Sequence, residues 1–281
     1  MSAYRFCRTD DVALLVDALN RCWLPYFPDE PPMTAAAFKR SIRDLQVWCS
    51  SCMVAFSGSD PIGVLIGAKR PSGTLVHKIA VHPDHRRQGH GRHLLASLGS
   101  KLAILGPPRI VAEVPEALAP ACALFSASGY VEEGRLTDYV LEWPALSERG
   151  NAARVEGFVI PVTVDDLAAN GLLGETHPAV CWERSVETLT ARKNDITGVA
   201  VASDEQIEAY LLYLKDGEMM SLRSFVDDGG SRLRLLLSRV GVATLRFPKV
   251  HPEEISRELL DALGFRPASE HRVYAAAARS D

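Results

Sequence analysis

Apolar residues recur at helical spacing in two stretches near the start of the chain. The first stretch covers residues 12–19 and the second covers residues 38–45. A short polar side chain precedes each stretch, Asp10 or Asp11 in the first case and Thr34 in the second, and such residues favour helix N-caps. The pattern therefore predicts two amphipathic helices, each capped by one of these side chains.

Strand-like and helical patterns alternate over the rest of the first half. Runs rich in Val, Ile and Leu predict strands, and leucines three and four residues apart predict a long helix. In chain order, the predicted elements are strands 52–56, 62–69 and 74–81, a helix over 92–105, strand 109–114, helix 121–129 and strand 139–143. This alternation is typical of an α/β domain that ends near Trp143.

A polar segment follows the first half. PALSERGNAARVE, residues 144–156, is rich in small and charged residues and has no hydrophobic period. We predict a first domain over residues 1–145, a linker over 146–156 and a second domain over 157–281.

Several short motifs of the first half return in the same order in the second. LFSASGY at 124–130 is matched by LLDALGF at 259–265, and a tyrosine, Tyr139 or Tyr274, follows each motif at the same distance. TDDVALL near the start is matched by VDDLAAN at 164–170. Each similarity is weak, but the shared order predicts two tandem copies of one fold. The alternative is chance similarity between two α/β halves.

The composition is that of a globular protein. Of 281 residues, 47% are hydrophobic and 23% are charged, and the formal net charge of -4 argues against nucleic-acid binding. No apolar run approaches the roughly 18 residues that a membrane span needs, and the N-terminal segment lacks the apolar core of a signal peptide. We expect a cytoplasmic protein with no nucleic-acid or membrane partner.

The cysteines give no clear metal or redox motif. Cys49 and Cys52 have the spacing of a zinc or redox pair, but no second pair of ligands follows at a matching distance. Alternating apolar residues after Cys52 indicate the start of a buried strand instead. We expect no metal site.

Residues 85–95, HRRQGHGRHLL, place two glycines in a basic cluster between a predicted strand and a predicted helix. No lysine follows the glycines, as a Walker A loop requires, and Leu94 stands where a dinucleotide fingerprint has its third glycine. Four histidines, at positions 82, 85, 90 and 93, are close enough in sequence to suggest a metal. The arginines between them would repel a cation, so neither a nucleotide loop nor a metal site is expected.

An anion site is the interpretation that remains. Gly89 and Gly91 allow the backbone to approach a ligand closely, and the helix start supplies free N–H groups and a positive dipole end. Arg86, Arg87 and Arg92 can add charge-assisted hydrogen bonds. The alternative is an ordinary capped helix with solvated arginines.

The longer segment IAVHPDHRRQGHGRHLL resembles the acetyl-coenzyme A signature of the GCN5-related N-acetyltransferases (GNAT). That signature is written R/Q-x-x-G-x-G/A after a strand that ends V-x-P, and the matching positions are Val81, Pro83, Arg86, Gly89 and Gly91. The resemblance covers residues 4–143. It implies an α+β fold whose mixed central sheet splays open at the cofactor site, between parallel strands 74–81 and 109–114.

The same resemblance implies which residues bind acetyl-CoA, the cosubstrate of the family. Ile79 and Val81 would bond the pantetheine arm through their backbone, and the amides of residues 86–91 would hold the pyrophosphate. The implied set is Ile79, Ala80, Val81, Arg86, Arg87, Gln88, Gly89, His90, Gly91, Arg92 and Phe125.

Acetyl transfer to an amine needs a base for the amine and a proton for the leaving thiolate. The family often has a glutamate base where this chain has Glu113, and His77 is a second candidate; a solvated carboxylate and a packed histidine are the alternatives. The family's tyrosine acid corresponds to Phe125 and its asparagine to Leu118, so neither usual residue is present. We expect Tyr139 or a water molecule to protonate the thiolate.

The second half lacks the signature. DDGGS is too short for it, and Asp227 and Asp228 would oppose a pyrophosphate. We therefore expect a degenerate second copy.

These observations together predict an acetyl-CoA-dependent N-acetyltransferase that modifies a primary amine of a small molecule by direct attack. The segment 22–34 falls where the family shapes its acceptor site, and Asp29 and Glu30 there would favour a cationic amine unless they are only surface residues. The alternatives are a non-catalytic acetyl-CoA sensor or scaffold, and a protein N-terminal or lysine acetyltransferase. We expect a monomer, in which the tandem copy replaces a second subunit, or a homodimer.

Overall fold

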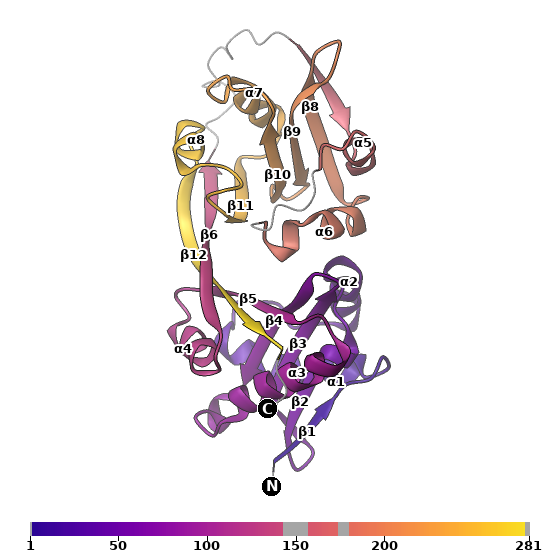
Figure 1. Ribbon diagram of the computed structural model, residues 1–281, viewed down its shortest axis with the longest axis vertical. Coiled ribbons are helices and arrows are strands. Elements are labelled where there is room, and N and C mark those ends of the chain that lie inside the picture. The colour runs from indigo at the N-terminus through magenta and orange to yellow at the C-terminus, as the bar shows by residue number, and fades with distance from the viewer. Residues whose placement is uncertain (1, 143–156, 174–179, 279–281) are drawn as a thin grey trace. The chain divides into compact units, whose positions relative to one another are not determined.

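The chain folds into two compact units (Figure 1). Unit 1 comprises residues 1–134 and 272–281, and unit 2 comprises residues 135–271. The computed structural model describes residues 2–142, 157–173 and 180–278. The predicted linker, 146–156, lies outside the described residues.

Unit 1 is built on a mixed sheet. In spatial order its strands are β1 (Ser2–Phe6), β2 (Met53–Ser57), β3 (Asp60–Arg70), β4 (Gly73–Val81), β5 (Arg109–Pro115) and the last part of β12 (Arg266–Ala277). The pairs β1–β2, β2–β3 and β3–β4 are antiparallel, whereas β4 and β5 are parallel. The sequence pattern missed β1 because it is an edge strand whose side chains are mostly exposed.

The predicted helices of unit 1 are confirmed. They are α1 (Val12–Cys22), α2 (Ala35–Leu45), α3 (His90–Leu105) and α4 (Ala119–Ala127). Thr34 caps α2 as predicted, since its side chain accepts the N–H of Ala37 at 3.1 Å. The predicted side-chain cap of α1 is wrong, because the Asp11 carboxylate instead accepts the N–H of Arg8 and a bond from Arg5.

The thiols of unit 1 belong to its packing. Cys49 opens a short 3-10 helix, η2 (Cys49–Ser51), and Cys52 leads into β2, whose first residues are buried as predicted. Burial raises the pKa of Cys7 to about 12 and that of Cys22 to about 11, so both stay protonated near neutral pH. Among the described residues, no group of three or more His, Cys, Asp or Glu side chains is placed to hold a metal ion.

Unit 2 repeats the order of elements with shorter helices. A four-stranded antiparallel sheet holds β7 (Phe158–Val162), β8 (Ile196–Ala202), β9 (Ile207–Leu214) and β10 (Met219–Ser224). In the same unit, the later part of β6 (Val131–Glu142) lies between β12 and β11 (Thr244–Val250). The helices are α5 (Val164–Ala169), α6 (Val186–Ala191), α7 (Ser231–Arg239) and α8 (Arg257–Ala262). No helix in the described part of the chain is long and apolar enough to cross a membrane.

The predicted tandem repeat is visible in the backbone. LFSASGY and LLDALGF each form the end of a helix and the turn into a long strand, at α4 to β6 and at α8 to β12. The glycines of these turns are both left-handed, with φ of 82° at Gly129 and 92° at Gly264. The tandem arrangement of two similar folds therefore extends to single turn residues.

The two long strands are exchanged between the units. β6 begins in unit 1 and continues in unit 2, where it pairs antiparallel with β11, and β12 begins in unit 2 and ends in unit 1 beside β5. Within unit 1, the Tyr274 ring of β12 stacks on Phe125 of α4 with 5.7 Å between centroids. The predicted domain limits, 1–145 and 157–281, do not anticipate this exchange.

Candidate active site

Strands β4 and β5 separate soon after they meet. Their parallel pairing joins Thr74 to Ile110 and Leu75 to Val111, and no further pair between them is found in the described residues. The register between β3 and β4 shifts by one residue at His77, which forms a bulge where the separation starts. The splayed sheet that the resemblance implied is confirmed.

Strand β4 turns backbone groups into this gap. The N–H of His82 donates to the carbonyl of Ile62 at 2.9 Å, and hydrogen-bonded pairs alternate with non-bonded pairs along an antiparallel ladder. Val81 and Ile79 fall at the non-bonded positions toward β3. Their N–H and C=O groups therefore face the gap, as binding of an amide-containing arm requires.

Helix α3 begins with two glycines that serve different purposes. Gly89 is the N-cap in the left-handed conformation, with φ of 86°, and no side chain caps the helix there. A Cβ on Gly91 would lie 3.0 Å from a methyl group of Leu124, so this position needs the space that glycine leaves. The first amides of α3 and the positive end of its dipole thus remain available to an anion.

One cavity of about 710 Å³ extends from the end of β4 to the start of α3. It is lined by Trp23, Tyr26, Phe27, Ile79, Ala80, Val81, His85, Arg86, Arg87, Gly89, His90, Gly91, Arg92, Leu118, Pro120, Ala121 and Leu124. Three arginines and no acidic side chain are among these lining residues. The apolar walls suit a pantetheine arm, and the arginines with the helix amides suit a diphosphate.

The cavity contains all of the predicted acetyl-CoA-binding residues except two. Gln88 is an exposed residue of the loop and Phe125 is 2% exposed in the core of unit 1. Sequence reasoning missed the wall that α4 provides through Leu118, Pro120 and Leu124. Their only signal was their place near the start of a predicted helix, which does not show what the helix faces.

The two candidate bases share one face of the sheet. The residues before and after Glu113 are buried in the core of unit 1, so Glu113 points away from that core. Val76 and Ile79 both pack into the same core, which leaves the bulged residues His77 and Lys78 on the opposite face. Glu113 and His77 each stand two residues beyond the last paired position of their strand. Neither lines the cavity itself.

The candidate acids lie elsewhere. Tyr139 is 5% exposed and packs in the core of unit 2 beside residues of α7 and β11. Phe125, which replaces the family's tyrosine, packs edge to face on Tyr130 and stacks on Tyr274. Both side chains therefore have a place in hydrophobic packing.

The histidines after β4 interact with an aromatic side chain of β1. The Tyr4 hydroxyl and His90 Nδ1 are 2.6 Å apart, and the His93 ring lies 3.8 Å from the Tyr4 ring between centroids. Burial lowers the pKa of His90, with smaller contributions from His85 and His93, so this imidazole is neutral near pH 7.

The segment 22–34 forms an aromatic wall that ends in a charge pair. The rings of Trp23 and Phe27 stack with 4.5 Å between centroids, and Trp23 Nε1 donates to the Glu30 carboxylate at 3.1 Å. Lys78 Nζ lies 3.9 Å from the Trp23 ring centroid and 4.0 Å from Glu30 Oε2. Glu30 therefore already interacts with a cation of the protein, which weakens the case for its attracting a cationic amine.

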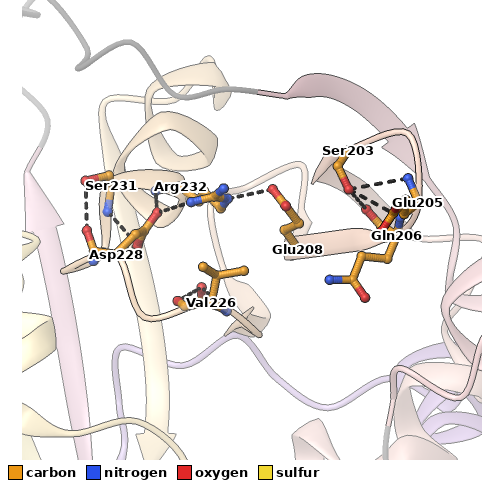
Figure 2. A network of polar contacts seen from close by, with 10 residues as sticks. Ser203, Glu205, Gln206, Glu208, Val226, Asp228, Ser231 and Arg232 are labelled. Carbon is orange, nitrogen blue, oxygen red and sulfur yellow. Dashed lines mark hydrogen bonds and ion pairs between the residues drawn. The ribbon is translucent and has the colours of Figure 1, made fainter.

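In unit 2, helix α7 begins in the same way as α3, but a carboxylate of the protein binds its first N–H groups (Figure 2). Gly230, the N-cap of α7, is left-handed with φ of 81°, like Gly89 before α3. The Asp228 carboxylate accepts the N–H groups of Gly230, Ser231 and Arg232 at 3.0 to 3.1 Å. The Arg232 guanidinium bonds Asp228 at 2.8 Å and Glu208 at 2.7 Å.

The charge at this position is reversed between the units. Arg87 stands two residues before the N-cap glycine in unit 1, and Asp228 stands two residues before it in unit 2. Arg232 stands where unit 1 has Gly91, counted from the same glycine, so a long side chain replaces the open space. The helix start of unit 2 therefore lacks the open space found in unit 1, and a carboxylate of the protein already occupies its N–H groups.

A small cavity beside β10 in unit 2 has a volume of about 50 Å³ and is lined in part by Arg184 and Glu254. The Arg184 side chain is 1% exposed, bonds Glu254 at 2.6 Å and donates to the carbonyls of Pro248 and Lys249. A satisfied buried ion pair therefore occupies this region.

The model of the Acetyltransferase (GNAT) family matches residues 13–130, which include all of the residues named as lining the cavity. The chain resembles this family over that segment. Over its whole length it has the fold of a tandem GNAT protein. A search of curated protein sequences gives no match.

Three solved structures illustrate the likeness. A tandem GNAT protein from the clavulanic acid biosynthesis pathway aligns with TM-score 0.68 and 17% identity, covering 100% of both chains. A GCN5-related N-acetyltransferase from Sphaerobacter thermophilus aligns with TM-score 0.69 and 15% identity, covering 99% of this chain and 96% of that one. A putative acetyltransferase from Pyrococcus horikoshii aligns with TM-score 0.65 and 16% identity, covering 99% and 90%. At these identities the structures show a shared fold.

Proposed function

We propose that the chain is an acetyl-CoA-dependent N-acetyltransferase that modifies a primary amine of a small molecule in the cavity of unit 1. One observation carries this proposal. A strand edge with inward-facing backbone groups and an uncapped helix start with three arginines line the same cavity. The edge suits the amides of a pantetheine arm, and the helix start suits a diphosphate.

The reaction proceeds by direct attack. The amine nitrogen bonds to the thioester carbonyl carbon and loses a proton to Glu113, with His77 as the alternative base. The carbon–sulfur bond then breaks, and the thiolate of CoA takes a proton from water because the family's tyrosine is Phe125 here. A thiolate whose thiol has a pKa near 8.5 leaves readily enough for this to suffice.

The packing of Phe125 and Tyr139 favours one alternative, an acetyl-CoA-binding module that does not catalyse. Release of CoA thiol, followed with a panel of primary amines, separates the two. An enzyme releases thiol in proportion to one or more amines, whereas a binding module releases none with any of them.

Calorimetric titration with acetyl-CoA tests the site directly. We expect one molecule bound per chain, and loss of binding in Gly89→Leu. Gly58→Leu is the matched control, because Gly58 is also left-handed (φ 62°) and also has nothing within 4 Å of an added Cβ. Equal loss in both variants would mean that backbone strain, and not the site, governs binding, and two molecules per chain would show that unit 2 also binds.

A further inference from the structure

Unit 1 contains a second cavity, which the proposed reaction does not use. It has a volume of about 760 Å³ and lies between helix α3, the start of β5, the turn from α4 to β6 and the last residues of β12. All of its named lining residues belong to unit 1. A cavity of this volume accommodates a small organic molecule.

The walls of this second cavity are largely apolar, and many of their side chains are short. Helix α3 contributes Ala96 and Gly99, and residues 275–277 at the end of β12 are three consecutive alanines. Leu95 and Ile110 supply larger apolar surfaces in the same lining. The short side chains leave space between the helix and the strands, and the apolar walls suit the apolar body of a ligand.

One positive charge in the lining is not balanced by a carboxylate. Arg109 and Glu133 form a two-point ion pair, with 3.1 Å between Arg109 Nη1 and Glu133 Oε1. Arg92 is the other charged residue of the lining, and its side chain has no ion pair or hydrogen bond with any residue in the described parts of the chain. The cavity therefore suits one negative charge joined to an apolar body, and a carboxylate carries that charge at neutral pH.

Arg92 also lines the first cavity, where the proposed function gives it the diphosphate as a partner. A guanidinium that is held by a carboxylate in the second cavity is withdrawn from that diphosphate. Two ligands can therefore compete for one side chain while they occupy different cavities. By linkage, each of them lowers the affinity for the other by the same factor.

We propose that the second cavity binds a small molecule made of an apolar body and one carboxylate, and that this molecule weakens acetyl-CoA binding through Arg92. The binding site itself is independent of the proposed function. Its effect on acetyl-CoA rests on the proposed function, because that effect assumes a diphosphate beside Arg92.

Titration with 4-phenylbutyrate, followed by ligand-observed NMR, tests the binding site. Its neutral amide, 4-phenylbutyramide, is the control for charge, and we expect the carboxylate to bind roughly tenfold more tightly because it forms a charge-assisted bond. Ala96→Phe places a ring in the cavity and should abolish binding. Ala103→Phe is the matched control, since Ala103 is exposed on the same helix but is not among the lining residues.

A calorimetric titration with acetyl-CoA at saturating 4-phenylbutyrate tests the coupling. We expect acetyl-CoA to bind at least roughly fivefold more weakly to the unchanged chain and to Ala103→Phe, with no change in Ala96→Phe.

The outcomes separate the site, the coupling and the proposed function. No binding of 4-phenylbutyrate, equal binding of its amide, or binding that survives Ala96→Phe would overturn the site. An unchanged affinity for acetyl-CoA would overturn the coupling. An equal loss of that affinity in Ala96→Phe would also overturn it, because the carboxylate would then compete inside the first cavity. If acetyl-CoA alone does not bind, the proposed function fails, while the first titration still decides whether the second cavity is a site.

Discussion

Replacing Asp228 by alanine tests how much its carboxylate stabilises the N-terminus of helix α7 in unit 2. The carboxylate receives three backbone N–H groups and the Arg232 guanidinium, and its side chain is 15% exposed. Loss of an N-cap costs about 0.5–2 kcal/mol, and loss of a charge-assisted bond adds to it. We expect the free energy of unfolding to fall by about 2 kcal/mol and Tm to fall by roughly 4–8 °C.

The neighbouring residue provides a matched control. Asp227→Ala removes the same charge from the same loop, but Asp227 is exposed. Thermal and urea unfolding followed by circular dichroism should show the loss of stability in Asp228→Ala alone. Equal effects of the two substitutions would refute the argument, because net charge would then explain them.

The dependence on pH provides a second check. Burial raises the pKa of Asp228, but the bonds from Arg232 and the helix amides outweigh it and hold the pKa below its ordinary value of 3.8. A depressed folded-state pKa contributes stability above the unfolded value, and that contribution is lost as the pH falls through the folded value. The stability gap between the unchanged chain and Asp228→Ala should therefore narrow as the pH is lowered below about 4. A gap that stays constant would contradict the role assigned to the ionised carboxylate.

Three further outcomes follow from unit 1 and from the exchanged strands. Gly91→Leu should weaken acetyl-CoA binding by roughly tenfold or more in calorimetry, because even a Cβ meets Leu124 at 3.0 Å. Glu113→Gln should lower kcat by about 100-fold with little change in KM, and the loss should shrink as the pH rises and more of the amine is already neutral; equal activity would move the role of base to His77. Asp138→Asn should lower the free energy of unfolding by about 2 kcal/mol at neutral pH. Burial raises the pKa of Asp138, but bonds led by that from His271 hold it at about 2, so this difference should disappear between about pH 4 and pH 2 in urea unfolding curves.

The glycine-rich helix start that we propose as an anion site could be located from the sequence because its features are local. Gly89, Gly91 and the arginines around them act within one turn of chain, and their spacing fixes where the N–H groups point. The role of Asp228 is also local, since it caps amides two to four residues ahead. Its charge alone indicated repulsion of an anion, and the structure adds that the carboxylate takes the anion's place.

The positions of Phe125 and Tyr139 could not be predicted in the same way. Each depends on which strand packs beside it, and the two long strands β6 and β12 both have 12 residues with similar motifs before them. The local sequence pattern is therefore compatible with packing of either side chain against either long strand. The contacts of Tyr26 and Lys78 with Val81 and Trp23 likewise join distant segments, for which a single sequence carries no signal.

The exchange of β6 and β12 also determines when the sheet of unit 1 can be completed during synthesis. The sheet of unit 1 is complete only when residues 272–277 lie beside β5, and these residues are synthesised after all of unit 2. At about 5–20 residues per second, the ribosome needs roughly 7–27 seconds to make unit 2. During that time β5 has no neighbouring strand on one side, and the Phe125 ring lacks its contact with Tyr274. An exposed strand edge and an exposed hydrophobic side chain favour aggregation and chaperone binding. Unit 1 is thus begun before unit 2 in synthesis and completed after it.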